Sequence, residues 1–183
     1  GSCARKRTSE MTVARVAIVD RNGEAAAATA AVIRARGHVA EHFVADVSDE
    51  AQVEAAVKGA TEKLGPVTVL FNHAGTIVIK PFLETTVQEW DWLHAVNGRS
   101  MFLMTRAVLP GMVERDRGHV INMGSVAGSY AYPGGNVYGG TKAFVQQFSR
   151  NLRADLLRTR VRVTCVDPGL VGGTEFSTVR FDG

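Results

Sequence analysis

Short apolar runs alternate with amphipathic segments along most of this chain. Five runs are rich in β-branched residues and lack strict alternation, and they span residues 14–20, 38–46, 66–72, 118–125 and 160–169. Segments with helical periodicity separate them, at residues 23–37, 48–65, about 86–114 and 136–159. Strands of this kind are typical of a parallel sheet that helices cover on both faces. The pattern therefore predicts an α/β fold with a doubly wound parallel sheet of the Rossmann-like type.

Composition adds few constraints to this picture. The chain has 183 residues, 45% of them hydrophobic, which suits a single domain over residues 14–183 after a polar leader at 1–13. No apolar run approaches the roughly 20 residues that cross a bilayer, so we expect no membrane partner. The net charge of +3 does not indicate a nucleic-acid partner. Two cysteines form no disulfide framework, which favours a reducing, cytoplasmic setting.

The histidines do not indicate a metal site. His38 and His42 are four residues apart, but they fall in a predicted strand, and no carboxylate–histidine set converges on them. Cys165 lies in another predicted strand, where we expect an inert, buried small side chain. We therefore predict no metal.

Polar residues and glycines follow each predicted strand. In doubly wound sheets ligands bind beyond the carboxyl ends of the strands. The residues at these ends are Asp20; Asp46 and Val47; Asn72, His73, Ala74 and Gly75; Gly124 and Ser125; and Pro168, Gly169, Leu170 and Val171. We expect a ligand at this edge of the sheet.

A tyrosine and a lysine open the last predicted helix. Tyr138 and Lys142 are four residues apart, so a helix places both on one face. The pair alone is a weak signal, because a surface tyrosine beside a surface lysine has the same spacing.

Several motifs in order resemble the short-chain dehydrogenase/reductase family. They are "DVSD", "NHAG", Asn97 in "HAVNGRS", Ser125 in "INMGSVAG", the Tyr138-x-x-x-Lys142 pair and "PG" at 168–169. Thirteen residues separate Ser125 from Tyr138, which also suits the family. From about Thr105 onward the sequence looks closest to the branch that oxidises serine, allo-threonine and other 3-hydroxy acids.

The resemblance implies a catalytic role for four residues. Tyr138 would be the acid or base, and the Lys142 ammonium would favour its phenolate form. Ser125 would polarise the substrate oxygen, and Asn97 would hold a water that links Lys142 to solvent. Two alternatives stay open: Ser125 as a turn serine that closes a strand, and Asn97 as a mid-helix polar residue.

The resemblance also implies a nicotinamide cofactor. Asp20 would accept hydrogen bonds from the ribose hydroxyls, which predicts NAD, whereas Arg21 could pair with a 2′-phosphate and leaves NADP possible. Asp46 and Val47 would frame the adenine, although a helix cap also explains Asp46. The remaining cofactor-binding candidates are Asn72, Ala74, Gly75, Pro168, Gly169 and Val171, besides Tyr138 and Lys142.

The family's glycine-rich phosphate loop has no counterpart before residue 14. Two functions therefore remain open: an alcohol or 3-hydroxy acid dehydrogenase, and an SDR-like remnant that turns over little and binds a protein partner. We expect a small-molecule alcohol or carbonyl substrate, with Arg180 or Gly172–Gly173 as candidates to meet a carboxylate. The two long helices predict a homodimer or homotetramer.

Overall fold

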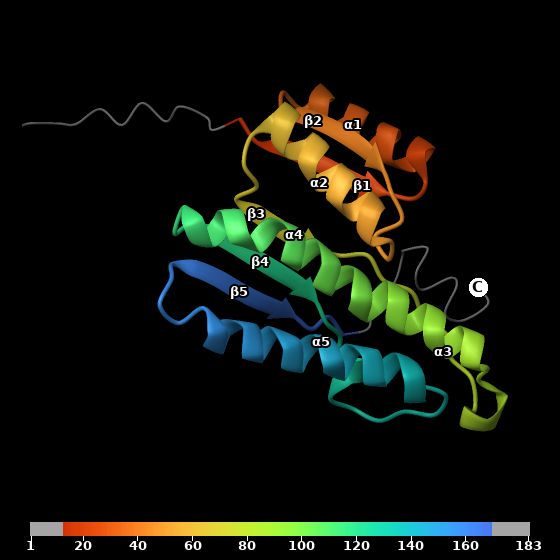
Figure 1. The fold of residues 1–183 in the computed structure, drawn as a ribbon. Helices are drawn as coiled ribbons and strands as arrows, with labels where there is room; N and C mark the ends of the chain where they lie inside the picture. The colour runs from red at the N-terminus through yellow and green to blue at the C-terminus, as the bar shows by residue number, and fades with distance from the viewer. Residues whose placement is uncertain (1–12, 170–183) are drawn as a thin grey trace, which may run out of the picture.

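A computed structural model describes residues 13–169 of the chain. Strands and helices alternate along these residues (Figure 1). The regular elements are β1 (Arg15–Asp20), α1 (Gly23–Ala35), β2 (Val39–Val44), α2 (Glu50–Leu64), β3 (Val69–Asn72), α3 (Val87–His94), α4 (Ser100–Glu114), β4 (Gly118–Met123), α5 (Asn136–Asp155) and β5 (Val161–Val166). All strand pairs are parallel. The predicted α/β class with parallel strands is confirmed.

The first two strands form a sheet with a helix on each face. The Cβ position of Gly23 in α1 faces the Val44 side chain, whereas that of Gly59 in α2 faces the Phe43 ring. Neighbouring residues of a strand point to opposite faces, so α1 and α2 cover opposite sides of β1–β2. Asp49 is the N-cap of α2, because its side chain accepts a hydrogen bond from the Gln52 amide.

The other three strands form a second sheet in the order β3-β4-β5. Helices α4 and α5 lie across one face of it (Figure 1). The core between this face and the helices includes Leu70, Val108, Met112, Val120, Leu152 and Val163. On the opposite face, Val69 and Phe71 are 55% and 51% exposed. Within residues 13–169, the helices that pack on this sheet therefore lie on one face of it.

The strands do not join into one continuous sheet among the described residues. Helix α2 packs on β1–β2 and also on α4, where Arg106 forms an ion pair of 3.5 Å with Glu50. Within residues 13–169, β1 is paired with β2 and β3 with β4, and no hydrogen-bonded pairing joins β1 to β3.

The helical region expected at about 86–114 is continuous but not uniform. A π-helical turn, η2 (Ala95–Arg99), joins α3 to α4. Such turns are rare and often mark functional sites, because the extra residue redirects one side chain. Here the redirected segment contains Asn97. In the part of the chain that the structure describes, no helix has the combination of length and apolar character that a bilayer span requires.

Candidate active site

Tyr138 and Lys142 lie on the inner face of α5. Both side chains are buried, with 4% and 5% of their surfaces exposed. The Lys142 ammonium lies 5.7 Å from the centre of the Tyr138 ring. These exposures exclude the surface-pair alternative. A buried ammonium beside a phenol ring is an arrangement that can support proton transfer.

The surroundings of Lys142 change its acidity. Burial lowers the pKa of its ammonium from 10.5 to about 8, and the nearby Cys165 and Asp167 oppose part of that shift. Its Nζ donates one hydrogen bond, of 2.9 Å, to the Met123 carbonyl at the end of β4. An ammonium has three protons, so within residues 13–169 two remain for a ligand.

Asn97 links the π-helical turn to the loop after β3 and to α5. Its Oδ1 accepts the Thr76 amide proton at 2.7 Å. Its Nδ2 donates to the Thr76 carbonyl at 2.9 Å and to the Thr141 hydroxyl at 3.0 Å. The side chain is 3% exposed, so its position depends on these three bonds. Asn97 therefore fixes the loop at Thr76 beside the residue that precedes Lys142.

Ser125 follows β4 and caps a short 3-10 turn, η3 (Val126–Gly128). Its Oγ accepts the Ala127 amide proton at 3.1 Å, which matches the turn-serine alternative. The hydroxyl proton is not used by that bond, so capping and donation to a ligand are compatible. The Ser125 carbonyl accepts from Gln146 Nε2 at 3.0 Å, and its amide donates to Asp167 Oδ1 at 3.1 Å.

A buried chain of polar side chains lies beneath these residues. Asn72 Nδ2 donates to the Thr105 hydroxyl and to Asn122 Oδ1. Asn122 in turn donates to Ser149, which donates to the Val145 carbonyl. Asn122 and Ser149 are both 0% exposed. Because all of these groups have partners, the chain ties β3, β4, α4 and α5 into one frame.

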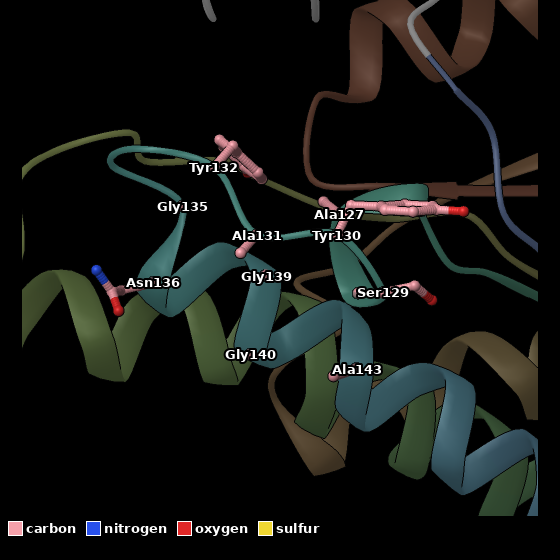
Figure 2. Close-up of a pocket in the computed structure, with 11 residues that line it drawn as sticks. Ala127, Ser129, Tyr130, Ala131, Tyr132, Gly135, Asn136, Gly139, Gly140 and Ala143 are labelled. Carbon is pink, nitrogen blue, oxygen red and sulfur yellow. The ribbon is translucent and has the colours of Figure 1, made fainter.

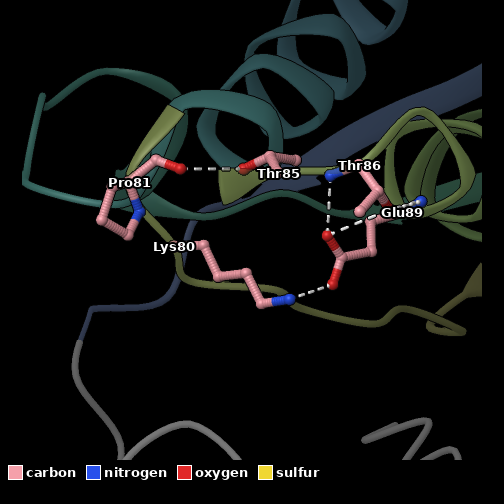
Figure 3. Close-up of polar contacts among 5 residues, drawn as sticks. All are labelled: Lys80, Pro81, Thr85, Thr86 and Glu89. Carbon is pink, nitrogen blue, oxygen red and sulfur yellow. Dashed lines mark hydrogen bonds and ion pairs between the residues drawn. The ribbon is translucent and has the colours of Figure 1, made fainter. Parts of the chain in front are cut away.

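A second set of polar contacts fixes the loop before α3 (Figure 3). Lys80 Nζ forms an ion pair of 2.5 Å with Glu89, while Thr86 and Glu89 form a reciprocal capping box. The Lys80 amide also donates to the Gly134 carbonyl at 3.2 Å. The loop after β3 and the loop before α5 are thereby held together near the start of α5.

Comparison with known proteins identifies the family. The model that describes the short chain dehydrogenases matches residues 5–182. This chain belongs to the short-chain dehydrogenase family. The resemblance drawn from the motifs is thus confirmed, including its closeness to the 3-hydroxy acid and serine dehydrogenase branch.

Individual relatives carry related descriptions. The NADP-dependent 3-hydroxy acid dehydrogenase YdfG of Salmonella typhi is 53% identical over 139 residues, which are 75% of this chain and 56% of that protein. Sulfoacetaldehyde reductase 2 of Chromohalobacter salexigens is 42% identical over 152 residues, 82% of this chain and 59% of the relative. This chain therefore spans little more than half the length of these relatives.

Solved short-chain dehydrogenase structures share the fold. The closed form of serine dehydrogenase complexed with NADP⁺ superimposes with a TM-score of 0.83 and 44% identity, covering 92% of this chain and 67% of that one. A family member from Burkholderia phymatum in complex with NAD also gives 0.83, with 29% identity over 86% of this chain and 57% of that one.

The adenine-side candidates lie at the carboxyl ends of β1 and β2. Asp20 Oδ1 accepts the Asn22 amide proton at 2.8 Å, so this carboxylate helps to begin α1. The Ser48 hydroxyl and amide, with a smaller effect of Arg21, hold the pKa of Asp46 below its ordinary value. Arg21 is exposed, and Val47 is half-buried. Asp20 and the exposed Arg21 therefore lie side by side at the carboxyl end of β1. Their groups differ in charge, and each suits a different form of the cofactor.

The remaining cofactor candidates lie nearer to Lys142. Ala74 and Gly75 are exposed, and a Cβ added at Gly75 would lie 3.7 Å from Lys142 Nζ. Pro168 accepts the Val126 amide proton at 3.1 Å, and Gly169 is exposed. The Asn72 side chain donates hydrogen bonds to Thr105 and Asn122 in the buried polar network described above. Val171, Arg180, Gly172 and Gly173 lie outside the described residues.

A surface pocket lies on another side of α5. It measures about 310 Å³ and is lined by the loop at 127–132 and by the small residues Gly139, Gly140 and Ala143 of α5 (Figure 2). Helical geometry places these residues on the side of α5 away from Tyr138 and Lys142. No group of three or more potential metal ligands converges within residues 13–169.

Several residues at the site had no local sequence signal. Thr76, Thr141 and Gln146 contact the candidates only through the folded chain. Asp167 had a weak signal, because it directly precedes the Pro168–Gly169 pair. Cys165, expected to be an inert, buried small side chain, is half-buried, and its thiol donates to Asp167 at 3.4 Å.

Proposed function

We propose that this chain carries the catalytic centre of an NADP-dependent short-chain dehydrogenase that acts on a 3-hydroxy acid. The observation that carries the proposal is the buried Lys142 ammonium beside the Tyr138 ring, on the helix whose Gln146 holds the Ser125 carbonyl. Support for the substrate class comes from the relatives described as 3-hydroxy acid and serine dehydrogenases.

The residues near Lys142 suit the nicotinamide half of the cofactor. The two unused Lys142 protons can meet ribose hydroxyls, and Gly75 leaves the approach open because it has no Cβ. When bound, the nicotinamide ring would accept or deliver the hydride. Among residues 13–169 we find no glycine-rich turn that would hold the pyrophosphate, so this half of the fit is incomplete.

Proton transfer in the oxidation direction can be assigned to this chain's own residues. The Tyr138 phenolate accepts the proton of the substrate hydroxyl, and the Lys142 ammonium stabilises that phenolate. The Ser125 hydroxyl donates to the substrate oxygen, because the Ala127 amide occupies only one lone pair of Oγ. Asn97 keeps Thr76 in place; in our proposal it also holds the relay water.

We favour NADP over NAD. The relatives at 53% identity are described as NADP-dependent, and Arg21 offers a guanidinium that can pair with the 2′-phosphate. Asp20 still favours NAD, and one solved relative contains NAD. We resolve this in favour of NADP because the relatives at 53% identity are described as NADP-dependent.

The experiment is an equilibrium titration of the chain with NADPH and NADH, followed by nicotinamide fluorescence. We expect saturable binding with NADPH preferred at least about tenfold, and Arg21→Ala should remove that preference by weakening NADPH alone. Turnover is then assayed with serine, allo-threonine and 3-hydroxybutyrate. Binding of neither nucleotide by a folded sample would contradict the proposal and favour the non-catalytic remnant.

A further inference from the structure

The end of β5 holds the segment around Ser125 in an unusual way. The backbone amides of residues 124–126 donate hydrogen bonds to residues 166–168, one to each. Gly124 donates to the Val166 carbonyl at 2.8 Å, and Val126 donates to the Pro168 carbonyl at 3.1 Å. The middle amide, that of Ser125, donates instead to a side chain, Asp167 Oδ1, at 3.1 Å. The Asp167 carboxylate therefore accepts the one amide proton of this stretch that does not go to a backbone carbonyl.

The neighbouring residues leave room for this carboxylate. A Cβ added at Gly124 would lie 1.9 Å from Asp167 Oδ1, which no side chain could tolerate. The Cys165 thiol donates to the same oxygen at 3.4 Å. Gly124 itself is buried, and the carboxylate occupies space that a Cβ at this position would fill. Gly124 on one segment and Cys165 on the other therefore help to place the Asp167 carboxylate against the Ser125 amide.

Asp167 also adds negative charge near the catalytic lysine. Its Oδ1 lies against Gly124, the residue after Met123, whose carbonyl accepts from Lys142 Nζ. The Cys165 thiol in β5 and the Asp167 carboxylate just after β5 oppose the lowering of the Lys142 pKa by burial. The other ionisable group against Lys142 is Tyr138, on its own helix. Asp167 is exposed, so solvent screens its effect, and we expect a modest one.

We propose that Asp167 is a positioning residue that fixes the Ser125 backbone and keeps a negative charge beside the Lys142 ammonium. The proposal rests on the proposed function, because Ser125 and Lys142 are the groups through which Asp167 acts. Gln146 holds the same serine from the other side, through the Ser125 carbonyl. With Ala127 on Oγ, each polar group of Ser125 then has a fixed partner.

Two substitutions separate the two effects. Asp167→Asn keeps an oxygen for the Ser125 amide but removes the charge, whereas Asp167→Ala removes both. Asp155→Asn is the matched control, since Asp155 is exposed near the end of α5, about 20 Å along the helix from Lys142. The first readout is the pH profile of kcat/KM. The second is hydrogen exchange of the Ser125 amide by NMR, which requires no activity.

We expect Asp167→Asn to move the alkaline limb of kcat/KM to lower pH by about half a unit to one unit, because Lys142 loses its proton more easily. Its Ser125 amide should keep its protection. Asp167→Ala should show the same shift, exchange the Ser125 amide at least tenfold faster, and lower kcat more than it raises KM. Asp155→Asn should match the wild type.

Two results would overturn the proposal: an alkaline limb of Asp167→Asn that superimposes on that of Asp155→Asn, or full protection of the Ser125 amide in Asp167→Ala. If the wild type shows no turnover, the proposed function fails by itself. The positioning role is then decided by amide exchange and by ¹⁵N titration of Lys142 Nζ. Unchanged values in both Asp167 variants would reject it, and the changes described above would support it.

Discussion

At the scale of single residues, the site depends on buried polar groups. Hydrogen bonds to specific partners offset the free-energy cost of burying them. Lys142 is the extreme case, since its ammonium is almost fully buried and its carbonyl partner, Met123, carries no formal charge. Desolvation of such a charge is costly, and the lowered pKa expresses that cost. A group kept under these conditions is typical of a functional site rather than of a stabilising one.

Removal of the Tyr138 hydroxyl tests the acid–base role directly. We expect Tyr138→Phe to lower kcat by about 10²–10⁴-fold, the range for loss of a positioned proton donor or acceptor. Tyr130→Phe is the control, because Tyr130 is 72% exposed. Steady-state kinetics with the best substrate measures both. Retention of more than a tenth of wild-type kcat by Tyr138→Phe would contradict the assignment.

The buried ammonium of Lys142 predicts a pH dependence of stability. Its folded pKa of about 8 lies below the ordinary value of 10.5, so the unfolded chain binds more protons between these values. The free energy of unfolding of the wild type should therefore rise with pH in this window, relative to Lys142→Met, by about 1–2 kcal/mol from pH 7.5 to 9.5. Urea unfolding at both pH values measures it.

Lys58→Met provides the control for this comparison, since Lys58 is exposed on α2. Its stability difference from the wild type should not change between the two pH values. If Lys142→Met also shows a constant difference, the lysine is not desolvated in solution.

At the scale of elements, local caps and one irregular turn determine how the site is presented. The capping box of Thr86 and Glu89 begins α3 and, through Lys80, fixes the loop that leads to it (Figure 3). The π-helical turn then rotates Asn97 toward Thr76 and Thr141. A regular helix through this region would direct Asn97 differently, because π turns insert one extra residue.

Loss of the α3 cap should destabilise the protein measurably. We expect Thr86→Ala to lower the free energy of unfolding by about 1 kcal/mol, because the Glu89 amide loses its acceptor. Thr29→Ala, within α1, is the matched control and should be neutral or slightly stabilising, because alanine has the higher helix propensity. Thermal or urea denaturation compares them, and equal effects of the two substitutions would contradict a capping role.

At the scale of the whole molecule, apolar surface remains on the outer side of the long helices. Phe102 on α4 and Phe144 on α5 are 45% and 48% exposed. Gly98 contacts Phe144, and Phe102 lies one turn after Gly98, so both rings share one face. Exposed aromatic residues in a contiguous patch are typical of protein–protein contacts.

This face predicts that the chain self-associates. We expect sedimentation at tens of micromolar to give a homodimer or homotetramer, and Phe144→Glu to shift it toward monomer, because a charge there would be desolvated in the contact. Val32→Glu is the control, on an exposed apolar residue of α1. A wild type that sediments as a monomer would refute the prediction.

The order of the elements and the class of fold follow from the hydrophobic pattern of the chain. Hydrophobic periodicity is local, so β1 through β5 and their helices were located to within a few residues. The polar residues after each strand, together with the family motifs, also placed Ser125, Tyr138 and Lys142 among the candidates. These signals depend on spacings of a few residues, which any alternative packing would preserve.

Which of those residues meet depends on contacts between distant parts of the folded chain. The Ser125–Asp167 and Asn97–Thr141 bonds join residues 42 and 44 positions apart, and no local pattern encodes them. The division of the strands into two sheets likewise appears only in the folded chain. Burial of Lys142 depends on several elements at once, and that burial converts an ordinary lysine into one with a pKa of about 8.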